Sequence, residues 1–139
     1  MIDLTSDFGV RAAAHLRDDP ILWLTTVVPG RGPLPTPVWF LWDGAESLRV
    51  YSLPTAKRLE HIAANQHVAA HFDGDGHGGD IVVFSGRASV DAGAPPADQA
   101  EAYLAKYASG LERLGITAGE FAARYTVAVR VNLTRLRGH

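Results

Sequence analysis

Short apolar runs separated by turn signals constrain the fold of this chain more than any other feature of the sequence. These runs are rich in β-branched and aromatic residues and predict strands at 21–28, 34–44, 47–53, 67–72, 80–91 and 125–133. The first run ends in the turn signal PGRGP (29–33), and the second ends in Asp43-Gly44. Strands joined by turns this short pair antiparallel, so the first three runs predict an antiparallel meander.

Helical spacing between these runs predicts short helices at 5–18, 55–65, about 95–109 and about 117–124. The first helix is expected to stop at Asp19-Pro20, because the residue before a proline avoids the α region. Leu59, Ile62 and Ala63 are expected to form the buried face of the second helix. Six strands joined mostly by hairpins predict a mainly β, α+β fold: an antiparallel β-barrel with helices packed outside.

The last run alternates in polarity, as a half-buried strand does. Its expected inward residues are Val127, Val129, Val131 and Leu133, and its expected outward residues are Thr126, Ala128, Arg130 and Asn132. We expect one domain spanning residues 1–139, because this length is that of a single ordinary domain.

Composition excludes several classes of function. The formal net charge of −2 argues against a nucleic-acid-binding protein, which needs a basic face for phosphates. The chain has no cysteine, which rules out disulfides, thiolate catalysis and cysteine-based zinc sites. No apolar signal segment and no run of about 18 apolar residues is present, so we expect no membrane span and a cytoplasmic location.

Metal and hydrolase chemistry find little support. His67 and His71 lie four residues apart on a predicted strand, roughly 13 Å at the usual rise, which is too far to chelate one ion. The loop DGDGHGGD (73–80) lacks the spacing and terminal glutamate of an EF-hand, so we expect a flexible hairpin loop and no metal. No G-x-S-x-G elbow is present.

The second run is apolar on both of its faces: Thr36, Val38, Phe40 and Trp42 alternate with Pro37, Trp39 and Leu41. In an antiparallel barrel one face of a strand meets the core, so the other face of this strand needs a separate cover. A partner subunit or a flat aromatic ligand would serve. We therefore expect an interface along this strand.

The order of these segments resembles that of the pyridoxamine 5′-phosphate oxidase-like proteins. More narrowly, it is similar to the small flavin- or deazaflavin-dependent oxidoreductases with a split β-barrel. The resemblance runs from about Leu24 to Val90 and is carried mostly by PTPVWF (35–40) and by the strand end followed by Thr55-Ala56-Lys57. It implies a homodimer of antiparallel split barrels, with two cofactor sites between the subunits that hold a flavin or the deazaflavin coenzyme F420.

The resemblance also implies roles for individual residues. The cofactor phosphate would lie at the end of the third strand and the start of the next helix, at Tyr51, Ser52, Thr55, Ala56 and Lys57. The cofactor ring would lie along Thr36, Pro37, Val38, Trp39 and Phe40, partly through backbone groups. Arg58 would assist at the phosphate, and Arg135 or Arg137 would reach across the dimer to an anionic tail.

Lys57 and Arg58 stand where a predicted strand turns into a helix, beside the positive end of the helix dipole. A phosphate there would accept hydrogen bonds from free N–H groups and from Ser52 or Thr55, with Lys57 as a point charge. The alternative is that Lys57 is simply solvated. Lys57 is the cation that we expect to bind the phosphate.

Two departures from the flavin-binding oxidases favour the deazaflavin over FMN. Those oxidases often carry an arginine where this chain has Ala56, and polar residues where it has Ile81, Val82 and Val83. The resulting prediction is an F420-dependent oxidoreductase that transfers hydride between the reduced cofactor and a small unsaturated organic substrate. The alternatives are an FMN-binding oxidoreductase and a non-catalytic protein that binds a cofactor or another planar anion such as haem. Solvent or a tyrosine could donate a proton, and Tyr103 and Tyr107 are expected to be packing residues.

Overall fold

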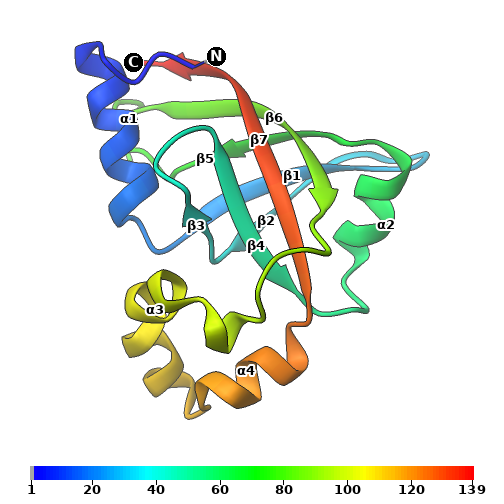
Figure 1. The fold of residues 1–139 in the computed structure, drawn as a ribbon. Coiled ribbons are helices and arrows are strands. Elements are labelled where there is room, and N and C mark those ends of the chain that lie inside the picture. The colour runs from blue at the N-terminus through cyan, green and yellow to red at the C-terminus, as the bar shows by residue number, and fades with distance from the viewer. Residues whose placement is uncertain (1) are drawn as a thin grey trace.

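The computed structural model describes residues 2–139, which form one seven-stranded sheet, four α-helices and a short 3₁₀ helix (Figure 1). The strands are β1 (Leu22–Val28), β2 (Gly32–Val38), β3 (Leu41–Trp42), β4 (Ser47–Ser52), β5 (His67–His71), β6 (Val82–Val90) and β7 (Val127–Gly138). The helices are α1 (Asp7–Asp18), α2 (Lys57–Ala64), η1 (Ala97–Gln99), α3 (Glu101–Leu114) and α4 (Ala118–Arg124). All strand pairs are antiparallel, which confirms the predicted mainly β fold.

The run at 34–44 forms two strands, so the prediction of one continuous strand was wrong. The sheet order is β2-β1-β5-β6-β7-β4-β3, which puts β2 and β3 at opposite edges although only Trp39 and Phe40 separate them. Three Cα steps span no more than about 11 Å. The two edges must therefore approach each other, and the sheet curls into a barrel that is split at this point.

A residue distant in sequence fixes this break. The hydroxyl oxygen of Tyr107, on α3, accepts the Phe40 backbone N–H at 2.8 Å and lies 2.9 Å from the Phe40 carbonyl oxygen and 2.8 Å from that of Pro20. Lys106 Nζ donates to the same Phe40 carbonyl at 3.2 Å. These contacts replace the strand pairing that Phe40 would otherwise make.

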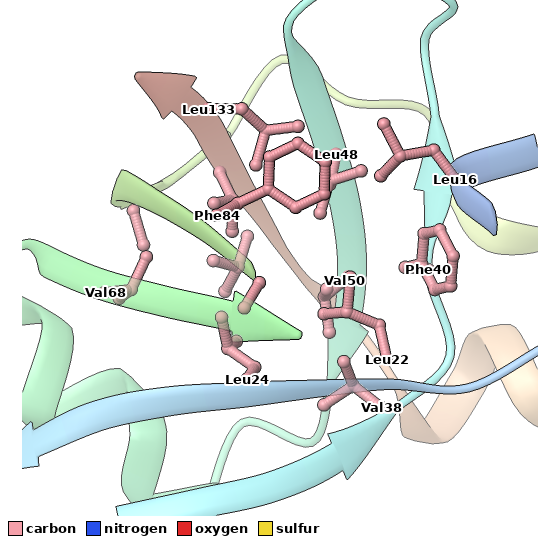
Figure 2. Close-up of a cluster of buried hydrophobic side chains, with 14 of the residues drawn as sticks. Leu16, Leu22, Leu24, Val38, Phe40, Leu48, Val50, Val68, Phe84 and Leu133 are labelled. Carbon is pink, nitrogen blue, oxygen red and sulfur yellow. The ribbon is translucent and has the colours of Figure 1, made fainter. Parts of the chain in front are cut away.

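The barrel core consists of inward-facing aliphatic and phenylalanine side chains from the strands, together with residues of α1 and α2 (Figure 2). Figure 2 shows its main members converging between the strands: Leu16, Leu22, Leu24, Val38, Phe40, Leu48, Val50, Val68, Phe84 and Leu133. On β7 the predicted inward residues Val129, Val131 and Leu133 are buried in this core.

A second apolar group, which we call the cap cluster, lies under α3 and α4. Its buried members are Tyr51, Ala97, Ala100, Tyr103, Tyr107, Leu111, Phe121 and Ala128. Figure 1 shows α3 and α4 together at one end of the molecule, opposite the two chain termini. Ala128 lies on the outer face of β7, as predicted, but it is buried because these helices cover that face at this end.

Local signals fix the helix ends. Ser6 caps α1 by accepting from the Gly9 N–H at 3.0 Å, and the helix stops at the extended residue Asp19, as predicted. The α3 helix begins later than expected, at Glu101, and it ends at Leu114, followed by the C-cap residue Gly115, whose φ of 69° is left-handed. Thr117 and Glu120 form a capping box on α4.

The expected face of α2 was only partly right. Ile62 is buried, but Ala63 is exposed and His61 is buried in its place. His61 Nδ1 lies 2.8 Å from the Thr26 hydroxyl, a polar pairing beneath the helix that hydrophobic spacing could not predict.

A cluster of charged side chains ties α1 to the glycine-rich loop before β6. His15 Nδ1 lies 2.7 Å from Asp19, and its Nε2 lies 2.9 Å from Asp80. Arg11 also contacts Asp80, at 2.9 Å. Both ring nitrogens of His15 face carboxylates, so the cluster favours the imidazolium form.

Candidate functional site

A pocket of about 450 Å³ lies between the break that separates β2 from β3, the start of α2, and the cap formed by α3 and α4. Its lining residues are Pro37, Val38, Trp39, Val50, Tyr51, Leu53, Ala56, Arg58, Tyr103, Leu114, Phe121 and Tyr125. This volume falls within the usual range for small-molecule sites, and a mostly apolar wall with a few polar groups is their usual composition.

Aromatic rings form most of the wall on the cap side. Trp39 stacks on Tyr107 at 4.5 Å and 9°, and on Phe121 at 5.7 Å and 20°. Tyr51 meets Tyr103 edge-on, with ring centroids 4.9 Å apart. Such mutually packed rings have little rotamer freedom, so the wall is preorganised and suits a planar apolar ligand.

Arg58 is the cation of this pocket. Its guanidinium donates to the Ser52 hydroxyl at 3.1 Å, and within residues 2–139 no carboxylate lies within 4 Å of it. Burial lowers the pKa of the Arg58 guanidinium from its ordinary value, and the nearby Tyr125 acts in the opposite direction. An arginine remains charged in proteins, so the pocket holds a partly desolvated positive charge without a counter-charge from the described chain.

The start of α2 adds free backbone donors to the same wall. Its N-cap residue is Ala56, which lines the pocket and makes no side-chain capping bond. The Ala56 and Leu59 N–H groups donate to the Leu53 and Ala56 carbonyls, so the N–H groups of Lys57 and Arg58 are the ones left without a partner in the helix or a capping side chain within residues 2–139. Together with Arg58, this helix start can bind an anion.

Lys57 lies elsewhere. Its side chain is 78% exposed, its Nζ lies 3.8 Å from Glu60 in the next turn, and it borders a separate groove beside the β1–β2 hairpin. Successive residues of a helix point about 100° apart, and here Arg58 lines the pocket whereas Lys57 lines the separate groove.

Tyr103 and Tyr107 lie one helical turn apart on α3 and are both buried, but their hydroxyls differ. The Tyr107 hydroxyl has the three backbone neighbours described above. Tyr103 lines the pocket and is 0% exposed, and its hydroxyl is the one buried side-chain polar atom in residues 2–139 without a hydrogen-bond partner. Burial raises the pKa of both hydroxyls, so both remain protonated at neutral pH.

The structure brings together some of the residues that the sequence singled out. Pro37, Val38, Trp39, Tyr51, Ala56 and Arg58 line the pocket. Ser52 is buried behind the pocket as the acceptor for Arg58, and the Tyr51 hydroxyl donates to the Pro95 carbonyl at 2.8 Å.

The remaining predicted residues do not line the pocket of this chain. The Thr36 hydroxyl lies 3.5 Å from the Leu24 carbonyl, Phe40 points into the barrel core, and Thr55 is exposed in the turn before α2. Arg135 and Arg137 are exposed on β7, opposite Ser85 and Val83. Arg135 lies eight residues beyond Val127, the partner of Ser52, which is about 26 Å along the strand.

Sequence reasoning missed the cap side of the pocket. Tyr103, Phe121 and Tyr125 come from the α3–α4 region, far along the chain from the strands that resemble a cofactor site. The spacing of Tyr103 and Tyr107 placed them on one helix face but could not show that one hydroxyl lacks a partner.

Two further findings concern metal binding and membrane-spanning helices. Across residues 2–139, no group of three or more His, Asp or Glu side chains is arranged so that it could hold a metal ion. None of the helices in the same residues has both the length and the apolar character needed to cross a membrane.

Comparisons with known proteins identify the fold and the family. A conserved hypothetical protein from Mycobacterium tuberculosis superimposes with a TM-score of 0.71 at 18% identity, covering 96% of this chain and 83% of that one. A FAD-binding protein from Mesorhizobium loti gives 0.65 at 18%, covering 91% and 88%. A protein described as F420 reductase gives 0.58 at 24%, covering 89% and 94%. At these identities the likeness shows the fold alone.

No curated protein matches the sequence. The sequence profile described as pyridoxamine 5′-phosphate oxidase matches residues 10–139, which is nearly the whole chain. The resemblance noted in the sequence is thereby confirmed: this chain belongs to the pyridoxamine 5′-phosphate oxidase family.

Proposed function

We propose that this protein is a deazaflavin (coenzyme F420)-dependent oxidoreductase that transfers hydride between the reduced cofactor and a small unsaturated organic substrate. One observation carries the proposal: an aromatic pocket of about 450 Å³ that contains a partly buried arginine without a carboxylate partner in residues 2–139. A planar ring with an attached phosphate complements both features. The family membership and the F420 reductase among the structural neighbours support the same reading.

The charge of the pocket favours the deazaflavin over FMN. The phosphate monoester of FMN carries a charge of about −1.5 to −2 at neutral pH, whereas the phosphodiester of F420 carries a single charge. Arg58 is the only cation among the residues that line the pocket in the described chain. Since a buried charge is tolerated only when it is paired, one arginine matches a diester better than a dianion.

The cofactor supplies the hydride chemistry when bound, and the residues of the chain bind, orient and shield it. The guanidinium of Arg58 and the N–H groups at the start of α2 would hold the phosphate. The aromatic wall, including Trp39 and Phe121, would exclude water from the ring. Positioning of this kind needs no protein nucleophile.

The site is proposed to be completed by a second copy of the chain. Pro33, Leu34, Pro35 and Pro37 are exposed on the edge strand β2, although most of this strand is apolar. Prolines lack the N–H that strand addition needs, so this edge is suited to side-chain packing rather than to extension of the sheet. In a homodimer, Arg135 or Arg137 of one copy would be available to the acidic tail of the cofactor bound beside the other copy.

A second candidate is an FMN-binding oxidoreductase. The compact volume of the pocket favours it, because FMN has no long tail and a pocket of about 450 Å³ can take the whole molecule. This candidate uses the same pocket and the same arginine, and it differs in which cofactor binds more tightly.

Fluorescence titrations of the purified protein with oxidised F420 and with FMN test the proposal. We expect micromolar binding of F420 and weaker binding of FMN, followed by turnover of the reduced cofactor with unsaturated acceptors. Tighter binding of FMN would move the protein to the second candidate. Saturable binding without turnover of any acceptor would indicate a non-catalytic cofactor- or haem-binding protein, and binding of neither cofactor would contradict an enzyme of either kind.

A further inference from the structure

The hydroxyl of Tyr103 is an unexplained feature of the pocket wall. The side chain is 0% exposed and lines the pocket, yet within residues 2–139 its hydroxyl has no hydrogen-bond partner. Buried polar groups in folded proteins are nearly always paired, because desolvation without a hydrogen bond costs free energy. A phenylalanine at this position would fill almost the same space without that cost.

The surroundings of Tyr103 explain why the chain does not satisfy the hydroxyl. Its ring packs against the rings of Tyr51, Tyr107 and Phe121, with centroids 4.9, 4.9 and 5.9 Å away. The hydroxyls of two of these neighbours are already engaged, that of Tyr51 with Pro95 and that of Tyr107 with Phe40 and Pro20. The Tyr103 side chain also borders the pocket, which is where a partner from outside the chain could lie.

Tyr107 shows that this depth of the cap cluster can satisfy a tyrosine hydroxyl. It lies four residues later on the same helix, and it has backbone partners at 2.8 and 2.9 Å. One hydroxyl therefore holds the fold together, and the other belongs to a pocket-lining residue and has no partner within residues 2–139. The difference indicates a role for the Tyr103 hydroxyl outside the packing of the chain.

We propose that the Tyr103 hydroxyl donates a hydrogen bond to a carbonyl oxygen of the planar ligand that occupies the pocket, and so fixes how the ring is oriented. This inference rests on the proposed function, since both flavin and deazaflavin rings carry carbonyl groups. A protonated phenol has one hydrogen to donate, and the carbonyl oxygens of such a ring are the acceptors that this hydrogen would meet. In this arrangement Arg58 binds the anionic end of the ligand and Tyr103 binds its neutral ring.

The test compares Tyr103→Phe with Tyr107→Phe, which removes a hydroxyl from the same helix face. Each variant and the wild-type protein are titrated with oxidised F420 and with FMN, and the thermal midpoints of the cofactor-free proteins are measured. For Tyr103→Phe we expect roughly tenfold weaker binding of the tighter cofactor, the usual effect of one hydrogen bond, with an unchanged or higher thermal midpoint. For Tyr107→Phe we expect a lower thermal midpoint.

The possible failures are distinguishable. Unchanged cofactor affinity in Tyr103→Phe would overturn this inference and leave the proposed function intact. If Tyr103→Phe lost as much thermal stability as Tyr107→Phe, the Tyr103 hydroxyl would have a structural partner. If light scattering showed a different molecular mass for Tyr103→Phe, the hydroxyl would belong to a subunit interface. Either result would also overturn the inference. Failure of the wild-type protein to bind either cofactor would overturn the proposed function and this inference together.

Discussion

The barrel core and the cap cluster are built from different side chains. The barrel core is aliphatic with a few phenylalanines, such as Phe40 and Phe84, and contains no tyrosine. The cap cluster has three buried tyrosines and borders the pocket, where a charged arginine and an unpaired hydroxyl lie beside apolar rings. Each of these polar groups weakens the cluster as a source of stability unless a partner satisfies it.

This contrast suggests how the chain divides its tasks. Close-packed apolar side chains stabilise the barrel without any requirement for a ligand. The cap cluster is sequestered well enough to exclude water but keeps polar groups for a bound molecule, as functional sites do at some cost in stability. Substitutions in the two regions should therefore affect different measurements.

The largest effect on stability is expected from Phe84→Ala in the barrel core. Phe84 is 0% exposed, and removal of a buried phenylalanine side chain costs about 3–5 kcal/mol of unfolding free energy. Chemical denaturation measures the loss. Val90→Ala serves as a control on the same strand, because Val90 is 54% exposed and should change stability by less than about 0.5 kcal/mol. Equal losses in the two variants would refute the assignment of the core.

The next largest effect is expected on the affinity for the cofactor, and it distinguishes the adjacent cations Arg58 and Lys57. Arg58→Ala should weaken cofactor binding by about 1.5–3 kcal/mol, the value of a hydrogen bond to a charged group, with little change in folding. Lys57→Ala should have a smaller effect, because that side chain is 78% exposed and paired with Glu60. Titration of both variants with F420 decides between the residue favoured by the sequence resemblance and the residue that lines the pocket. A larger loss for Lys57→Ala would place the phosphate outside this pocket.

The smallest expected effect is a pH dependence of stability, which arises from His15 on the barrel side of the molecule, away from the pocket. Partial burial disfavours the charged form of His15, but hydrogen bonds to Asp19 and Asp80 outweigh it and raise the pKa of this histidine above 6.5. The stabilisation is complete below about pH 6.5 and is lost as the pH rises through the raised value. Because these groups are partly exposed, we expect the charged His15 to contribute only about 0.5–1 kcal/mol to the free energy of unfolding.

Thermal midpoints of wild type and His15→Gln between pH 5.5 and about pH 9 measure this contribution. The difference between the two proteins should be largest at low pH and should close as the pH rises. Burial lowers the pKa of Lys106 to about 8, so this lysine also titrates in the range studied. The difference between the two proteins removes its influence, because both contain it. His67→Gln is the control, since His67 is exposed at the start of β5. A pH-independent difference would show that His15 is not charged in the folded protein.

Local patterns in the sequence predicted much of the fold. Alternation located the buried residues Val129, Val131 and Leu133, and turn and capping signals located the ends of α1 and the β1–β2 hairpin. The break at Trp39-Phe40 was not predictable in this way, because apolar residues continue through it. It depends on Tyr107, which is 67 residues away in sequence.

The site was predictable only in part for a similar reason. The resemblance located the strand end and helix start that border the pocket, but not the rotation of α2 about its axis, which turns Arg58 toward the pocket and Lys57 away from it. Ala128 shows the same limit, since its burial depends on helices that a strand pattern does not reveal. Contacts between distant segments decide such details.

A crystal structure of the protein grown with oxidised F420 tests the central claim most directly. Our account predicts electron density for the deazaflavin ring in the pocket lined by Trp39, Tyr51 and Tyr103, with the phosphodiester on Arg58 and the start of α2. Density for the cofactor in the groove beside Lys57 and the β1–β2 hairpin, with this pocket empty, would contradict it.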